Sequence, residues 1–347
     1  MAGLESLAAG AAAVSLLPAL GFCYQQVGDR LDAKRFPPPG RLVDIGGLRL
    51  HSLTQGPPLQ ASRGQVHGPS VIFDSALASS SISWALVQPR VARRFQTLSY
   101  DRAGSGWSDP SPRPRRLENT VDELYRLVKA LELPPPYLIV GHSYGGFTAR
   151  FFAHRHRKEC AGLVLLDAAD EHQWIDLKPE DERKIVQGAR LARRARWLAH
   201  LGLTRLVVQL ARAGNRGKAR SIGSALGVGL PRQAQQRLLA PLQQLPEDLR
   251  RPIGWFWTRP HFYASLADTI ARVPQAARTM ADISGYGNLP LAVLAADNED
   301  PVWLPRQKAL AKLSRRGCFV HAQNSSHWIP LDRPQLVADT IRDLLRQ

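Results

Sequence analysis

Short apolar runs alternate with segments whose apolar residues recur at helical spacing along much of the chain. Buried strands are predicted at residues 71–73, 96–100, 137–140, 163–167, 291–296 and 318–321. One helical stripe consists of Val121, Leu124, Val128 and Leu131, and residues 120–123 at its start resemble a capping box. A second stripe consists of Val337, Ile341, Leu344 and Leu345. This alternation predicts the α/β class, with a mostly parallel central sheet covered by helices on both faces.

A hairpin is predicted near the start of the folded part. Residues 42–45 and 48–53 are separated by Gly46-Gly47, a pair that favours a tight turn. The proline-rich segment 36–40 before it is typical of a stiff linker.

A long insertion is predicted between two of the strands. About 120 residues separate 163–167 from 291–296, whereas loops in compact folds rarely exceed about 15 residues. We therefore predict a helical cap at residues 171–287, inserted into a core formed by residues 37–170 and 288–347. Residues 1–36 form an N-terminal apolar helix and linker.

The predicted cap is rich in basic residues. Its first helix combines the apolar positions Ile185, Leu191, Trp197, Leu198 and Leu201 with Arg183, Lys184, Arg190, Arg193, Arg194 and Arg196, and residues 205–212 repeat this character. Two interpretations stay open: a solvated helix face, or a cap surface that contacts anionic lipid.

The N-terminal segment is uncharged. Residues 6–28 are long enough to span a bilayer, which takes about 20 residues, although alanine, glycine and proline make them only modestly apolar. Arg30, Lys34 and Arg35 follow, and the positive-inside rule would place the folded domain on the cytoplasmic side. We predict a transmembrane anchor; a helix packed on a soluble protein and a cleaved signal are the alternatives, and residues 1–6 lack the basic start of a signal.

Composition narrows the possible partners. Lys and Arg number 46 against 29 Asp and Glu, a formal net charge of +17 that favours anionic surfaces. No zinc-finger spacing, RNP-like signature or long basic block is present, so nucleic-acid binding is not expected. Cys23, Cys160 and Cys318 are isolated, which argues against a disulfide framework or structural zinc. We expect no cofactor and no metal.

The sequence Gly141-His142-Ser143-Tyr144-Gly145 carries the strongest chemical signal. An apolar strand precedes it and a helix-compatible run follows, so Ser143 is predicted at the tip of a sharp strand-to-helix turn. Such a turn exposes a serine hydroxyl, which suits a nucleophile. We predict that Ser143 is catalytic.

A serine nucleophile needs a histidine as base and an acid that holds this base in the right tautomer. Along the chain, the serine is followed first by the acid and then by the histidine. His327, in the loop after the last strand, is the predicted general base. Asp300, after strand 291–296, is the predicted acid, with Asp297 in reserve. Asp167 and Asp170 are interpreted as structural or at the cap hinge, although an acid can act from there.

The chain resembles the α/β-hydrolases, in particular a capped group with a D-R-x-G-x-G-x-S loop. The resemblance runs from about Arg41 to Arg346 and rests on residues 101–108 and 141–146, on Asp300-Pro301, and on His327 with Asp332-Arg333-Pro334 behind it. It implies acyl transfer to water through an acyl-enzyme, with an oxyanion hole of two backbone N–H groups. One of these would come from Tyr144.

The second oxyanion donor lies where this chain departs from the family. Most members have His-Gly at the end of the third strand, whereas this chain has the run Asp74-Ser75-Ala76-Leu77. If Ser75-Ala76 replaces His-Gly, Leu77 supplies the N–H. A charged Asp74 about 4 Å from the oxyanion would oppose it by about 4 kcal/mol at an effective dielectric constant of about 20.

The resemblance and the site together predict a serine hydrolase that cleaves a carboxylic ester with an apolar or lipid-like acyl group. Cap aromatics could line an acyl pocket or simply form cap core, namely Trp255, Phe256, Trp257, Phe262 and Tyr263. Hydrolysis of an amide, thioester or C–C bond and a catalytically silent binding protein are the alternatives. Haloalkane dehalogenases and epoxide hydrolases need Asp at the position of Ser143. A small-molecule ester is the expected substrate and an anionic membrane surface a possible partner.

Overall fold

The computed structural model describes residues 2–57, 68–175, 177–227 and 240–346. One mixed sheet lies at its centre, with strand order β1-β2-β4-β3-β5-β6-β7-β8. The strands are β1 Arg41–Asp44, β2 Arg49–Gln55, β3 Ser70–Asp74, β4 Thr97–Tyr100, β5 Tyr137–His142, β6 Cys160–Leu166, β7 Leu291–Ala296 and β8 Gly317–Ala322. The β1–β2 and β2–β4 pairs are antiparallel, and the pairs from β4 through β8 are parallel. The predicted hairpin, strands and mostly parallel sheet are confirmed.

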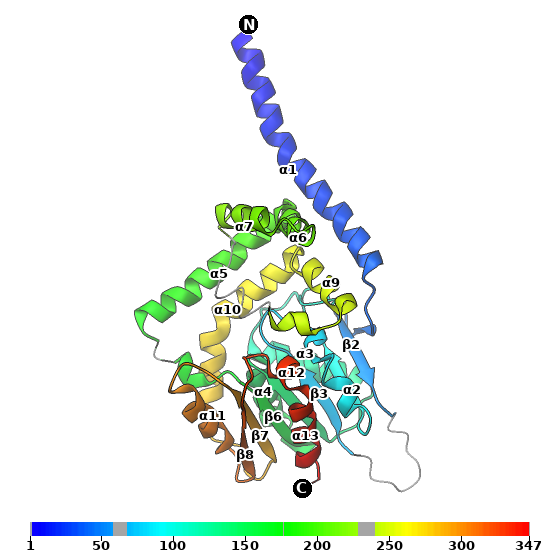
Figure 1. Cartoon of the computed structure of the whole chain (residues 1–347), viewed down its shortest axis with the longest axis vertical. Helices are drawn as coiled ribbons and strands as arrows, with labels where there is room; N and C mark the ends of the chain where they lie inside the picture. Colours follow the sequence, from blue (N-terminus) through cyan, green and yellow to red (C-terminus); the bar gives the residue numbers. More distant parts are fainter. Residues whose placement is uncertain (1, 58–67, 176, 228–239, 347) are drawn as a thin grey trace.

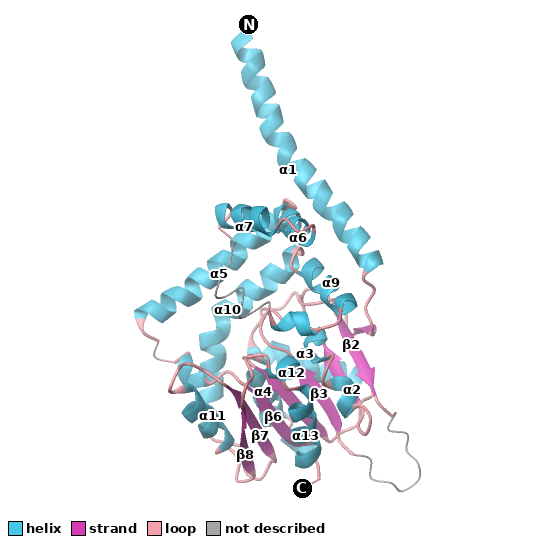
Figure 2. Ribbon diagram, viewed as in Figure 1, coloured by secondary structure: helices cyan, strands magenta, loops and turns pink. Residues whose placement is uncertain are grey.

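Helices cover both faces of the sheet, as Figure 2 shows. On one face Val121 and Leu124 of α3 (Leu117–Ala130) pack with Phe147 of α4 (Gly145–Arg155). On the other face lie α2 (Gln88–Val91) and α13 (Pro334–Leu344). Alternate residues of one strand enter the two clusters, as Ile139 and Val140 of β5 do. The sheet is therefore buried on both sides, which explains its continuous apolar runs.

The segment between β6 and β7 is helical. Its helices are α5 Pro179–His200, α6 Leu203–Arg212, α7 Arg216–Ala225, α9 Glu247–Phe256 and α10 Pro260–Ala281. Figure 1 shows them gathered beyond one end of the sheet. Short elements complete the described fold: the 3-10 turns Ser81–Trp84, Arg157–Glu159, Glu171–Gln173 and Pro241–Gln244, and helices α11 Trp303–Ala311 and α12 Ile329–Asp332. The cap is helical as predicted, and its limits at residues 171–287 stay a prediction.

Residues Ala2–Arg35 form one long helix, α1, whose start stands away from the rest of the molecule in Figure 1. Across the ranges that the structure describes, no helix is long and apolar enough to cross a membrane. The transmembrane helix predicted within residues 6–28 is therefore not supported. The cytoplasmic placement derived from it stays a prediction.

Candidate active site

Ser143 lies at the tip of the turn between β5 and α4. Its φ of +54° is in the left-handed region, where only a tightly held non-glycine residue persists. Its N–H donates to the Leu166 carbonyl at 3.0 Å, and its carbonyl accepts from the Ala169 N–H at 3.0 Å. The first loop residues after β6 thus fix the turn, and Ser143 lies at the carboxyl edge of the sheet.

Glycine is required on both sides of this serine. A Cβ atom at Gly141 would lie 2.4 Å from the Gly145 carbonyl oxygen, and one at Gly145 would lie 2.5 Å from the Asp74 carbonyl oxygen. Both contacts are with backbone and cannot be relieved by a side-chain movement. The G-x-S-x-G spacing is therefore imposed by the tightness of the turn and by the loop after β3.

His327 and Asp167 are brought together from two loops. The Nδ1–H of His327 donates to Asp167 Oδ2 at 2.6 Å. The other oxygen of Asp167 accepts from the Trp303 Nε1–H at 2.7 Å and from the Ala296 N–H at 3.0 Å. Asp167 is buried, whereas the His327 side chain is 41% exposed. With Nδ1 as the donor, Nε2 is left as a potential proton acceptor.

The prediction of Asp300 as the partner of His327 is wrong, because the structure pairs His327 with Asp167. Asp300 is exposed, and its Oδ1 accepts from the nearby Val302 N–H at 3.1 Å. The reserve candidate, Asp297, accepts instead from His321 Nε2 at 2.8 Å. Strand β6, which ends directly before Asp167, is the neighbour of β5, so Asp167 lies beside the Ser143 turn. The loop after β8 carries His327 to this position.

A signal for Asp167 was present in the sequence but was given a structural interpretation. His142 and Leu166 are register partners in β5 and β6, so Ser143 and Asp167 are the first residues beyond two paired strand ends. Adjacent parallel strands place such residues at the same edge. A carboxylate directly after the strand that follows the nucleophile strand is therefore a candidate for the acid as well as one in a later loop.

His142 supports the loop that carries His327. Its Nε2–H donates to the His327 carbonyl at 2.7 Å, and the two imidazole rings lie 4.8 Å apart. Complete burial lowers the pKa of His142 well below its usual value, an effect that His327 reinforces. His142 is therefore neutral and acts on the position of His327 rather than as a base.

The loop after β3 is fastened by Arg102. Its Nη1–H groups donate to Asp74 Oδ1 at 2.5 Å and to the Ser75 carbonyl at 2.8 Å, and Nη2–H donates to the Ala76 carbonyl at 2.6 Å. Burial raises the pKa of Asp74, and the charge of Arg102 opposes that shift. The negative charge of Asp74 would repel an oxyanion, and the positive charge of Arg102 beside it offsets this repulsion.

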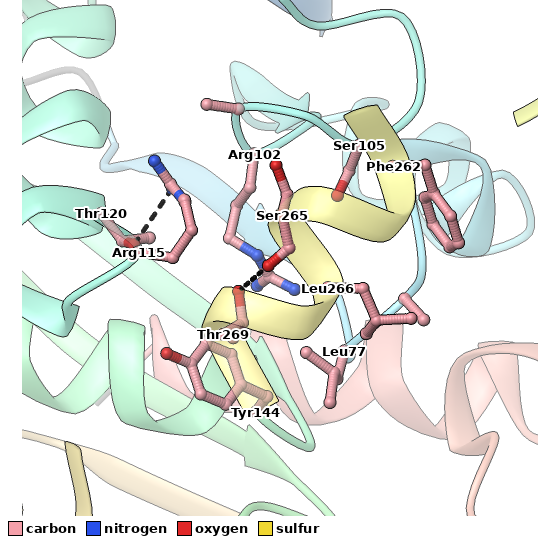
Figure 3. A pocket seen from close by; sticks show the side chains of 12 residues that line it. Leu77, Arg102, Ser105, Arg115, Thr120, Tyr144, Phe262, Ser265, Leu266 and Thr269 are labelled. Atoms are coloured by element: carbon pink, nitrogen blue, oxygen red, sulfur yellow. Dashed lines mark hydrogen bonds between the residues drawn. The ribbon is translucent and has the colours of Figure 1, made fainter. Parts of the chain in front are cut away.

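Leu77 and Tyr144 carry the two backbone N–H groups predicted as oxyanion donors. Among the residues that the structure describes, neither N–H donates to another protein group. Both residues line one pocket of about 20 Å³, which Figure 3 shows beneath α10. Arg102, Phe262, Ser265 and Leu266 also line this pocket. Asp74 does not.

The cap aromatics divide between pocket and core. Phe262 lines the pocket. Trp255 and Phe256 instead belong to a buried cluster with Phe36 and Trp107. For this pair the structure favours the cap-core interpretation.

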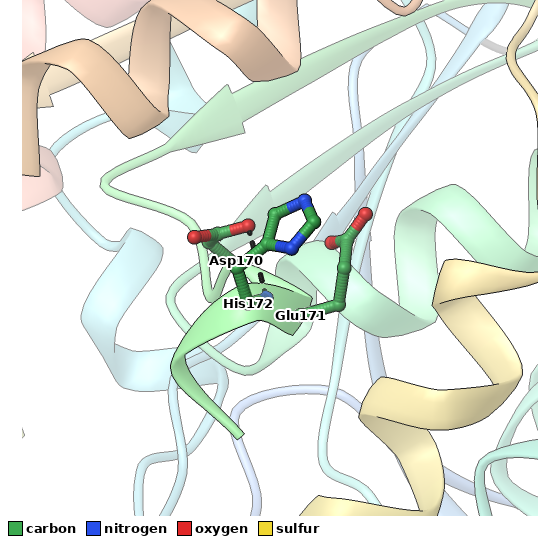
Figure 4. Close-up of side chains that lie close together, drawn as sticks. All are labelled: Asp170, Glu171 and His172. Carbon is green, nitrogen blue, oxygen red and sulfur yellow. Dashed lines mark hydrogen bonds between the residues drawn. The ribbon is translucent and has the colours of Figure 1, made fainter. Parts of the chain in front are cut away.

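One group of side chains has the composition of a metal site. Asp170, Glu171 and His172 offer ligand atoms within 4.8 Å of one another (Figure 4). Among the described residues, this is the one cluster of three such side chains close enough to hold a metal ion. However, both carboxylate oxygens of Glu171 accept from the buried Arg150, at 2.5 and 2.9 Å. That guanidinium already neutralises the carboxylate and would repel a cation.

The fold agrees with the comparisons with known proteins. The family model described as alpha/beta hydrolase fold matches residues 69–334, and the chain belongs to this family. An esterase from Thermogutta terrifontis has a TM-score of 0.60 at 20% identity, covering 88% of this chain and 97% of that one. An enol-lactonase from Burkholderia xenovorans has a TM-score of 0.59 at 17% identity, covering 88% and 100%. These structural likenesses show the fold.

Sequence relatives match over shorter stretches. The uncharacterized protein YqjL of Bacillus subtilis is 36% identical over 102 residues, which is 29% of this chain and 40% of that protein. A haloalkane dehalogenase of Sphingobium indicum is 27% identical over 155 residues, covering 43% and 49%. The chain thus matches less than half the length of these two curated relatives.

Proposed function

We propose that the protein is a serine hydrolase that cleaves a carboxylic ester through an acyl-enzyme, with Ser143, His327 and Asp167 as its catalytic triad. The observation that carries this proposal is the 2.6 Å bond from His327 Nδ1 to the buried Asp167 beside the Ser143 turn. Asp167 fixes the tautomer in which Nε2 can accept a proton. A haloalkane dehalogenase reaction would need a carboxylate at position 143.

In this mechanism His327 Nε2 takes the proton from Ser143 Oγ as the oxygen attacks the ester carbonyl. The N–H groups of Leu77 and Tyr144 would stabilise the oxyanion of the tetrahedral intermediate. His327 then protonates the leaving alcohol, and the same imidazole activates water to release the acid and restore Ser143. Asp167 stabilises the imidazolium in both halves of the reaction.

The pocket beside Leu77 and Tyr144 has a volume of about 20 Å³, that of a water-sized site, and Arg102 and Ser265 give part of its wall a polar character. Ser143 and His327 are not among its lining residues, so this pocket does not set a limit on the acyl chain. An ester with an apolar or lipid-like acyl group stays the proposed substrate. Amide, thioester and C–C hydrolysis would use the same residues. The structural neighbours include an esterase, an enol-lactonase, an epoxide hydrolase and a meta-cleavage product hydrolase, so they do not separate these bond types.

The test is activity on p-nitrophenyl esters of increasing acyl length, together with labelling by a fluorophosphonate. Wild-type protein should hydrolyse the acetate and form an adduct at Ser143, and Ser143→Ala should lose both. Labelling without ester turnover would point to another bond type. Absence of an adduct at Ser143 would instead favour a catalytically silent binding protein.

We also propose an anionic membrane surface as a partner. The basic cap and the exposed apolar side chains of α1 support this proposal.

A further inference from the structure

One face of α1 exposes large apolar side chains at helical spacing. The exposed fractions are 70% for Leu17, 63% for Leu20, 39% for Tyr24, 55% for Val27 and 62% for Leu31. Intervals of three and four residues place all five on one stripe of the helix. Most other large apolar side chains in the described structure are buried, so this stripe is a local feature.

The orientation of this stripe is fixed by a buried junction between α1 and the cap. Arg205 of α6 donates from Nε to Gln25 Oε1 at 3.1 Å, and its Nη1 is paired with Asp32. Trp255 Nε1–H donates to Asp29 Oδ1 at 2.6 Å. Gln25 and Arg205 are almost fully buried. Because this polar side of α1 faces the cap, the apolar stripe lies on another side of the helix. Tyr24, at the edge of the stripe, also contacts the cap, since its OH donates to Gln209 Oε1 at 2.6 Å.

Two exposed apolar residues of the cap lie close in sequence to residues that contact α1. Trp197 of α5 is 70% exposed and lies one turn before Leu201, whose carbonyl approaches Gly21 of α1. Leu206 of α6 is exposed and follows Arg205, which packs against Gly28. We name these residues the docking face: Leu17, Leu20, Tyr24, Val27, Leu31, Trp197 and Leu206.

Basic residues belong to the same elements as the docking face. The exposed ones are Arg30, Lys34 and Arg35 of α1, Arg183, Lys184, Arg190, Arg193, Arg194 and Arg196 of α5, and Arg212 of α6. The sequence has no acidic residue between Arg183 and Pro246. A second copy docked on this face would bring like charges together, whereas lipid phosphates would neutralise them.

We propose that the docking face binds the surface of an anionic phospholipid bilayer. Its leucines and Trp197 enter the boundary between headgroups and acyl chains, and the neighbouring arginines and lysines bind lipid phosphates. This docking specifies the membrane partner proposed above. It does not depend on ester hydrolysis, so Ser143→Ala should bind bilayers as the wild type does.

The experiment is flotation of the full chain with vesicles of phosphatidylcholine, with and without phosphatidylglycerol, at low and high salt. Wild-type protein should float with the anionic vesicles and be released by salt. The variant L20E/L31E should bind about tenfold or more weakly, because two apolar side chains no longer enter the bilayer and two added carboxylates face lipid phosphates. Leu42→Glu, an exposed leucine on β1 outside the face, is the matched control and should bind normally.

A second variant guards against misfolding of the first. Arg193→Gln with Arg196→Gln keeps the apolar side chains and should also weaken binding to anionic vesicles. Equal binding by L20E/L31E and the wild type, or no binding of the wild type at low salt, would overturn the proposal. A wild-type dimer in sedimentation that L20E/L31E dissociates, without vesicle binding, would show that a second copy covers this face.

Discussion

Asp167 is held by hydrogen bonds to three groups, from His327, Trp303 and the Ala296 backbone. Asp167→Asn would keep the size of the side chain but remove the charge that stabilises the imidazolium. We expect kcat for an ester to fall by about 10³–10⁴-fold. Asp300→Asn is the matched control and should change kcat little, since Asp300 is exposed and bonds only to its own loop among the described residues. The opposite ranking of the two variants would reject Asp167 as the acid.

Arg102 gives a second prediction at this scale. It binds the carbonyls of Ser75 and Ala76, and with them the loop that presents the Leu77 N–H. Arg102→Gln should lower kcat by about 10–100-fold. This is less than the roughly 10²–10³-fold decrease in kcat that follows complete loss of one oxyanion donor, because the Leu77 N–H is displaced and not removed. KM should change less, because the donor acts on the transition state.

The control for this loop is Arg113→Gln, which removes an exposed arginine paired with Asp122. Its kcat should match that of the wild type. If Arg102→Gln raises KM and leaves kcat unchanged, Arg102 acts on substrate binding through the pocket it lines and not on the oxyanion loop.

At the scale of elements, α4 and the 3-10 turn Glu171–Gln173 are joined by the buried pair Arg150 and Glu171. Bonds from Arg150 lower the pKa of Glu171 against the opposing effect of its burial. A carboxylate with a lowered folded-state pKa stabilises the fold above its unfolded pKa, and this contribution is lost as pH falls through the folded value. Glu171→Gln should therefore destabilise the protein by about 3 kcal/mol at neutral pH, with Arg150 left buried and unpaired.

Chemical denaturation of both proteins across acidic pH checks this prediction. The difference in unfolding free energy between wild type and Glu171→Gln should shrink as the pH is lowered. Glu180→Gln at the exposed start of α5 is a suitable control, with little change expected at any pH. A difference that is constant with pH would contradict the role assigned to the ion pair.

The elements that the sequence predicted best are those buried on both sides. Strands such as Tyr137–His142 are apolar throughout because helices cover both faces, and the Ser143 turn is marked by glycines that its geometry demands. The partner of His327 could not be assigned from the sequence, because chain order does not reveal the path of the loop that carries His327 from β8 past β7 to the end of β6.

At the scale of the whole molecule, the packing of α1 against the cap was the least predictable feature. Its uncharged stretch suggested a membrane span, yet Gln25, Asp29 and Asp32 are directed to the cap by residues more than a hundred positions away. Nothing local to residues 6–28 indicates that Arg205 will lie against Gly28. Such long-range polar contacts carry no periodic signal along the chain.

The junction between α1 and the cap leads to a prediction for the whole molecule. Arg205 joins Gln25 and Asp32 of α1 to Thr258 of the cap, and it is buried. Arg205→Met keeps much of the apolar stem but removes every one of these bonds and leaves Asp32 without its cation. We expect α1 to detach from the cap, with Tm lowered by several degrees, since loss of about 2–3 kcal/mol corresponds to roughly 2–4 °C per kcal/mol in a chain of this size.

Limited proteolysis distinguishes detachment of α1 from general unfolding. Trypsin should cut Arg205→Met within residues 30–35 faster than it cuts the wild type, while the core from β1 onward stays intact and Ser143 still reacts with a fluorophosphonate. Arg220→Met, an exposed arginine of α7, is the control for loss of a basic cap residue and should be cleaved at the wild-type rate. Uniform digestion of core and α1 together would mean that Arg205 stabilises the fold as a whole, and equal cleavage of wild type and variant would mean that other contacts hold α1 in place.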